Sequence, residues 1–140
     1  MHAVRIGPAV FNSLAHLTGA GGIDKPSTSL PYYTVKSPLT ILARPGRGVI
    51  ITLIGGAKNA ALVYSHSWLQ RLAAWHYDFS QVPRSIRVTL CRDAKSKLPL
   101  NTQYAGGLLL RKLGCITIQV RVIRETRARR ARVPIGVLHC

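Results

Sequence analysis

Acidic residues are scarce in this sequence of 140 residues, whose four carboxylates are Asp24, Asp78, Asp93 and Glu125. Asp78, Asp93 and Glu125 fall at a predicted helix end, in a loop and in the C-terminal segment, and no predicted strand carries a carboxylate. An RNA-processing enzyme that works through two metal ions needs several clustered carboxylates. We therefore expect no enzyme activity, no catalytic residue, no bound metal, no cofactor and no small-molecule substrate.

Cysteine is also rare. Cys91, Cys115 and Cys140 are odd in number and form no C-x-x-C pair, which argues against a disulfide framework and against a zinc site. Cys91 and Cys115 fall in apolar stretches, where cysteine commonly serves as a small core residue, and this usage favours a reducing compartment. His139 beside Cys140 supplies two potential ligands, fewer than a structural metal site needs.

Long apolar runs are absent as well. No stretch reaches the roughly 18 uncharged apolar residues of a transmembrane helix, so no membrane span is predicted. Hydrophobic residues nevertheless make up 47% of the chain, and its mean hydropathy is +0.14. A chain of this length and composition can bury a core and fits one folded domain.

Positive charge is what the sequence has in excess, since 20 lysines and arginines against 4 acids give a formal net charge of +16. Such a charge on a chain with a core indicates a polyanionic partner. Arginine outnumbers lysine by 14 to 6. The guanidinium fork holds phosphates at two points and stacks on bases, which favours RNA over a membrane surface. The predicted RNA-binding residues lie at turns and toward the C-terminus: Arg44, Arg47, Lys58, Arg92, Lys95, Lys97, Arg111, Lys112, Arg124, Arg127, Arg129, Arg130 and Arg132.

Five stretches have the composition of strands. Residues 39–43, 49–54 and 60–65 are rich in β-branched and apolar residues and predict a three-strand meander, with a hairpin connection over 55–59. Residues 84–91 and 115–123 alternate apolar and polar side chains, as half-buried strands do.

Two helices are predicted between these strands. The first covers about 65–82, where four large apolar side chains share one helical face: Trp68, Leu72, Trp75 and Phe79. The second begins with Asn101 as its cap and ends at Gly114. The resulting order, strand–strand–strand–helix–strand–helix–strand, predicts an α/β domain with a mixed sheet of about five strands and ribonuclease-H-like layering.

The chain is expected to divide into three parts: residues 1–38 as an N-terminal extension and linker, 39–123 as the α/β RNA-binding domain, and 124–140 as an arginine-rich tail. The first 22 residues are typical either of an organellar targeting segment or of an amphipathic extension lying on a partner. The tail has five arginines within the nine residues 124–132, and their mutual repulsion predicts an extended or irregular path between phosphates.

Several sequence stretches share a pattern with a known family. Residues 50–53, Asn59, Leu62 and Tyr64 match a strand, a turn ending in Gly-Asn and a second strand. Further along, the matching stretches are 86–88, 110–114 and 116–118, followed by a basic tail. Over about residues 39–132 the chain resembles the universal small-subunit ribosomal protein eleven family. The large-subunit protein eighteen family has a similar order of elements, so membership of that family stays open.

The resemblance implies a structural constituent of the ribosome on the platform of the small subunit, in contact with rRNA and neighbouring ribosomal proteins, with mRNA near the exit side as a further partner. The N-terminal extension suggests a divergent mitochondrial member, located on ribosomes of the matrix. The alternative from another class is a basic accessory subunit of a mitochondrial inner-membrane respiratory complex.

Overall fold

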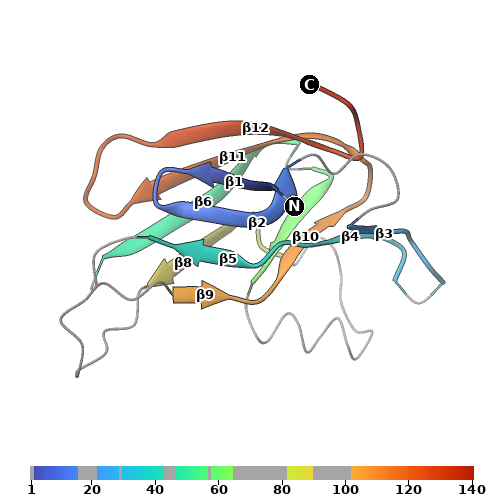
Figure 1. Cartoon of the computed structure of the whole chain (residues 1–140), viewed down its shortest axis with the longest axis horizontal. Helices are drawn as coiled ribbons and strands as arrows, with labels where there is room; N and C mark the ends of the chain where they lie inside the picture. Colours follow the sequence, from blue (N-terminus) through green and yellow to red (C-terminus); the bar gives the residue numbers. More distant parts are fainter. Residues whose placement is uncertain are drawn as a thin grey trace.

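The protein is an assembly of short antiparallel strands (Figure 1). The computed structural model describes residues 2–15, 22–28, 30–42, 47–56, 58–64, 82–89 and 102–140. Within these ranges there are strands and no helices. The strands are β1 (His2–Ile6), β2 (Ala9–Ala15), β3 (Ile23–Asp24), β4 (Tyr33–Lys36), β5 (Leu39–Ile41), β6 (Gly48–Gly55), β7 (Ala60–Val63), β8 (Ser85–Thr89), β9 (Thr102–Tyr104), β10 (Gly107–Leu110), β11 (Gly114–Val122) and β12 (Arg129–Ile135).

These strands form three four-stranded sheets, in the orders β1-β2-β5-β9, β3-β4-β10-β7 and β12-β11-β6-β8. Each strand pairing in the described ranges is antiparallel. The prediction of an α/β domain with parallel crossovers and two helices is therefore wrong. Residues 65–81 of the first predicted helix lie outside the described residues, and Val82 is buried and belongs to no helix.

The predicted meander is wrong in its pairing, although its three strands are confirmed as β5, β6 and β7. Each of the three belongs to a different sheet. Strand β6 buries one face and leaves the other half exposed, whereas all four residues of β7 are buried. A strand that is apolar on both sides needs cover on both sides. Ala60 and Leu62 of β7 lie in the main core, and Ala61 and Val63 lie in a second cluster with Val82 and Leu109. Within its sheet, β7 pairs with β10.

The predicted helix from Asn101 to Gly114 is replaced by β9 and β10. Its apolar residues do not share a helical stripe: Leu108 and Leu110 enter the main core, while Leu109 joins a second cluster with Ala61 and other residues. A short apolar run is compatible with either a buried strand or a helix. Gly107 decides between them, because a Cβ atom there would lie 1.7 Å from the carbonyl oxygen of Val35 on β4. Only glycine permits that approach of two strands.

One hydrophobic core lies where the three sheets meet. Phe11 from β2 is fully buried and packs edge-on against Tyr64, with 6.4 Å between the ring centroids. The Tyr64 hydroxyl donates a 2.7 Å hydrogen bond to the carbonyl oxygen of Ser37, and burial raises the pKa of Tyr64 above its usual range. A bulge at Ser13, with φ of 62°, lets both Phe11 and Leu14 face this core.

Both chain ends contribute strands to this fold: β1 to β4 come from residues 1–38, the predicted N-terminal extension and linker, and β12 comes from residues 124–140, the predicted tail. Strands β1 and β2 form a hairpin that lies against β12 (Figure 1). Ile6 and Phe11 from this hairpin, and Val133 and Ile135 from β12, are core residues. Their burial ties both terminal segments to the same core as β5–β11.

A disulfide joins Cys115 on β11 to Cys140, so the prediction that these two cysteines form no disulfide is wrong. Neither residue belongs to a spacing pattern, and their pairing follows from the path of β12. This strand runs antiparallel to β11, and its end at Ile135 lies opposite Gly114. Gly136, with φ of 69°, then turns the last residues back toward Cys115. Cys91 lies outside the described residues.

We predict that losing this disulfide lowers the free energy of unfolding by about 3.5 kcal/mol, because the bond closes a loop with a sequence separation of 25 residues. Urea denaturation of the wild type, with and without a thiol reductant, measures this loss against Cys140→Ser. The Cys140→Ser variant should match the reduced wild type and should not respond to reductant. Equal stability of the oxidised wild type and the variant would contradict the prediction.

Candidate nucleic-acid interface

The β12-β11-β6-β8 sheet has an inner face in the core and an outer face with polar side chains. Along β11, the inner residues Ile116, Ile118 and Val120 are buried, and the residues between them are half-buried. Strand β6 alternates in the same way. Since successive side chains of a strand point to opposite faces, this pattern assigns each residue of the sheet to one face.

Four arginines lie on the outer face. Cross-strand neighbours share a face, so Arg130 joins Gln119, and Arg132 joins Thr117. Ile50 of β6 stands opposite Arg121 on one side and Arg87 on the other. We call this surface the arginine face, made of these residues: Arg87, Arg121, Arg130 and Arg132, with Ser85, Thr52, Thr117 and Gln119 between them.

The arginine face carries cations without opposing carboxylates, since no Asp or Glu occurs in β6, β8, β11 or β12. Arg87, Arg130 and Arg132 are exposed. Arg87 and Arg121 are separated by two inter-strand steps, or about 10 Å, and Arg130 and Arg132 by about 7 Å along β12. The result is a spread of positive charge over a sheet surface that also offers hydroxyl and amide groups.

Two hydrogen bonds hold arginines of this face in place. Arg130 Nε donates to the side-chain oxygen Oε1 of Gln119 at 2.9 Å, across the β11–β12 pairing. Arg121 Nη1 donates to the backbone carbonyl oxygen of Glu125 at 3.4 Å. Each guanidinium has five N–H donors, so both keep donors for a further acceptor such as a phosphate oxygen.

The predicted tail forms part of this sheet. Residues 129–135 are the regular strand β12, paired along its length with β11, so of the two predicted paths they follow the extended one and not the irregular one. Pairing with β11 separates the arginines by alternation: Arg130 and Arg132 point outward, while Arg129 lies opposite the buried Val120 on the inner side. Pairing with β11 therefore keeps residues 129–135 in a regular strand, whereas charge repulsion would keep the same segment disordered in isolation.

The other predicted RNA-binding residues lie at the two ends of β6. Arg47 precedes β6 and pairs with Glu125 at 3.4 Å, next to Arg124 and Arg127 in the β11–β12 loop. At the opposite end, Lys58 lies in the turn after β6, where the Arg111 backbone N–H donates to the Asn59 carbonyl oxygen at 2.7 Å. Lys112 follows Arg111 and is exposed. The remaining predicted residues, Arg44, Arg92, Lys95 and Lys97, lie outside the described residues.

Two arginines of the face were missed by sequence reasoning. Arg87 and Arg121 both occupy polar positions in alternating strands, a signal that the sequence contains. The alternation did not reveal that β8 and β11 flank the same strand, β6. Only that topology brings Arg87 and Arg121 onto one surface.

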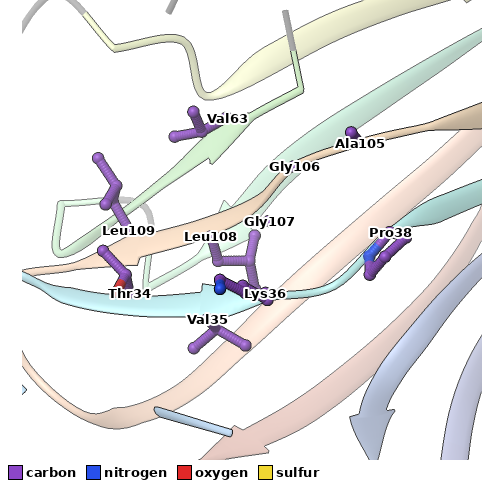
Figure 2. Close-up of a pocket in the computed structure, with 10 residues that line it drawn as sticks. All are labelled: Thr34, Val35, Lys36, Pro38, Val63, Ala105, Gly106, Gly107, Leu108 and Leu109. Carbon is purple, nitrogen blue, oxygen red and sulfur yellow. The ribbon is translucent and has the colours of Figure 1, made fainter. Parts of the chain in front are cut away.

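A pocket of about 450 Å³ lies on the sheet β3-β4-β10-β7. Figure 2 shows it beside Gly106 and Gly107, with Thr34 and Lys36 from β4 and Val63 from β7 around it. Its lining is mostly apolar. Among its described lining residues Lys36 is the one charged side chain, so it lacks the convergent polar groups of a catalytic site.

The described residues offer neither a metal site nor a membrane-spanning helix. No group of three or more histidine, cysteine, aspartate or glutamate side chains lies together in the part of the chain that the structure describes. The described residues also contain no helix of the length and apolarity that crossing a membrane requires.

The loop between β11 and β12 contains a strained residue. The Glu125 N–H donates to the Val122 carbonyl oxygen at 3.0 Å, which closes a four-residue turn. Arg124, its third residue, has φ of 76°, whereas Ile123 does not have a positive φ. This combination is typical of a type II turn, in which glycine or asparagine normally occupies the third position.

We predict that Arg124→Gly raises the free energy of unfolding by about 1 kcal/mol, because glycine adopts this φ without the clash that a Cβ causes. Thermal unfolding should show a midpoint about 3–4 °C higher. Arg124→Ala is the matched control, since it removes the same charge and keeps the Cβ. If both variants gain equally, relief of charge repulsion and not of backbone strain is the cause.

A scan against protein-family models finds no match for this chain, and neither do searches of curated proteins and of solved structures. The function is therefore argued from the chain's own residues.

Proposed function

We propose that this protein is a non-enzymatic RNA-binding protein that holds the phosphate backbone of RNA on its arginine face. The observation that supports the proposal is the grouping of Arg87, Arg121, Arg130 and Arg132 on one sheet surface whose strands carry no carboxylate. Arginines bind phosphate by two-point hydrogen bonds and release the counterions condensed on the nucleic acid. This electrostatic mechanism needs no catalytic group.

The side chains between the arginines favour RNA over an anionic membrane surface. Thr117 offers a hydroxyl group and Gln119 offers an amide to phosphate oxygens and ribose hydroxyls. The Thr52 and Ser85 hydroxyls hydrogen-bond each other at 3.0 Å, which leaves one further hydroxyl donor between them. Stable attachment to a membrane surface instead needs a large apolar contribution beside the charge. On β6 the arginine face has Ile50, which is half-buried, and Ile54, which is 43% exposed.

A place in the mitochondrial ribosome, with rRNA and ribosomal proteins as partners, stays a prediction. The resemblance behind it includes two helices, and the structure has strands where the second helix was expected. The arginine face supports RNA binding independently of this resemblance. A structural role beside rRNA would give this face a suitable partner, since rRNA presents closely spaced phosphates.

We predict that Arg87→Gln, Arg130→Gln and Arg132→Gln together reduce the slope of log K against log salt by about 2 units, at roughly 0.7 per lost phosphate contact. Fluorescence anisotropy with a single-stranded oligouridylate over a range of salt concentrations measures the slope. Arg121 is left unchanged because it also bonds the Glu125 carbonyl oxygen.

The matched control removes three exposed cations from the other sheets and their connections, by Arg5→Gln, Lys25→Gln and Lys36→Gln. This variant should keep the wild-type slope within about half a unit, since it loses no phosphate contact. Equal slopes for the two triple variants would overturn the arginine face as the binding surface. Binding to phosphatidylserine vesicles together with no binding to RNA would overturn RNA as the ligand.

A further inference from the structure

A pocket of about 370 Å³ opens at the end of the molecule where the β11–β12 loop meets the β1–β2 turn. Figure 1 shows both connections at the same end, on the left. The pocket lies between two sheets, with Gly7 and Pro8 on one side and Val120 and Val122 of β11 on the other. It is distinct from the arginine face, which is the outer surface of the same β11.

We call the large apolar side chains that line this pocket its floor: Leu42, Val120 and Val122. Leu42 lines it and is 39% exposed, one of the few large hydrophobic side chains that the described residues leave accessible. A 2.7 Å hydrogen bond from the Leu42 N–H to the Pro8 carbonyl oxygen fixes the chain after β5 against the β1–β2 turn. Val122 is half-buried beside them. This floor offers an apolar contact to a flat group.

The rim of the pocket is charged. Among the described lining residues, Arg47, Arg127 and Arg129 lie with Glu125, and their three positive charges and one negative charge sum to +2. Glu125 pairs with Arg47 at 3.4 Å. Arg129 leans over Gly7, where an added Cβ would lie 3.2 Å from its Cγ atom. Arg127 and Arg129 have no carboxylate partner among the described residues, and both are exposed.

We propose that this pocket takes one nucleotide of a single-stranded RNA, with its base on the apolar floor and its phosphate on Arg127 and Arg129. The inference rests on the proposed function and names the form of RNA. A nucleotide combines an apolar ring with an anionic phosphate, as the pocket combines floor and rim. The volume lies near the lower end of small-ligand sites, roughly 300–1,000 Å³. A paired base cannot enter, since it is stacked inside the duplex.

The path of the hairpin connects this pocket to the arginine face. Arg129 and Arg130 are neighbours on β12, and strand alternation places them on opposite sides of the sheet. One RNA strand can therefore contact the face through Arg130 and continue around the end of the hairpin to Arg127 and Arg129. Glu125 offers its carboxylate to a base amino group or a ribose hydroxyl at the rim.

The test compares a short oligouridylate, the same strand without bases, and an RNA duplex, all by fluorescence anisotropy. Leu42→Ser should weaken oligouridylate binding about tenfold, as loss of a base contact does. It should leave the abasic strand, the duplex and the salt slope unchanged. Leu42→Val keeps the floor apolar and should bind like the wild type, and thermal unfolding of both variants checks that the fold is retained.

The charged rim is tested by the pair Arg127→Gln and Arg129→Gln against the pair Arg130→Gln and Arg132→Gln. The rim pair should weaken binding of single strands only, whereas the face pair should weaken single strands and duplex alike. Wild-type binding by both Leu42→Ser and the rim pair would overturn the pocket proposal, while loss of binding by the face pair would still support the proposed function.

A competition experiment and a vesicle-binding experiment separate the sources of an anionic ligand. Uridine monophosphate should displace oligouridylate from the pocket at lower concentration than inorganic phosphate does. Equal competition by the two would overturn a nucleotide site in favour of a simple phosphate site. Loss of binding to phosphatidylserine vesicles by the rim pair, with RNA binding unchanged, would overturn it in favour of a lipid headgroup.

Discussion

The pairing of β11 with β6 on one side and β12 on the other is the constraint on which the rest of the structure depends. This central strand places Ile116, Ile118 and Val120 in the core and the residues between them on the outer surface. Because its register with both neighbours is fixed by the buried residues, every arginine on β12 has a set direction. A shift of one residue would bring Arg130 and Arg132 toward the core.

The same pairing explains how a chain with a net charge of +16 folds around a hydrophobic core. Charges on a strand point alternately to two faces, so neighbouring arginines of β12 are separated by the sheet itself. The disulfide between Cys115 and Cys140 closes the end of the hairpin that is far from the arginine-rich loop. Repulsion among the arginines therefore acts on a segment that is held by backbone pairing, by apolar burial and by a covalent bond.

The fold tolerates repulsion among its arginines, and the approach of an anion would relieve this repulsion. A surface of this kind gains free energy when phosphates approach, because the phosphates relieve the repulsion and release their counterions. Strand β12 contributes alternate residues to both sites. Arg130 and Arg132 belong to the arginine face, and Arg129 lines the pocket at the hairpin end. The two sites differ in what surrounds the charge: hydroxyl and amide groups on the face, an apolar floor in the pocket.

Several elements could be predicted from the sequence, and they are those whose pattern is local. Residues 49–54, 84–91 and 115–123 show β-branched residues or alternation, and all three are strands at nearly the predicted bounds. The stretch around Leu108–Leu110 was predicted as part of a helix and is strand β10, since a short apolar run fits a buried strand and a helix equally. The N-terminal residues, among them Ile6 and Phe11, have little periodicity of their own, and their burial depends on partners from other sheets.

The sequence by itself determined the excess of arginine and the scarcity of carboxylates, because net charge does not depend on the fold, and these two features led to the proposal of a polyanionic partner. The tertiary structure decided which arginines share one surface. Arg87 and Arg121 are 34 residues apart and meet only because β6 pairs with both of their strands. Strand partners are chosen by burial over long sequence distances, and no local pattern encodes that choice.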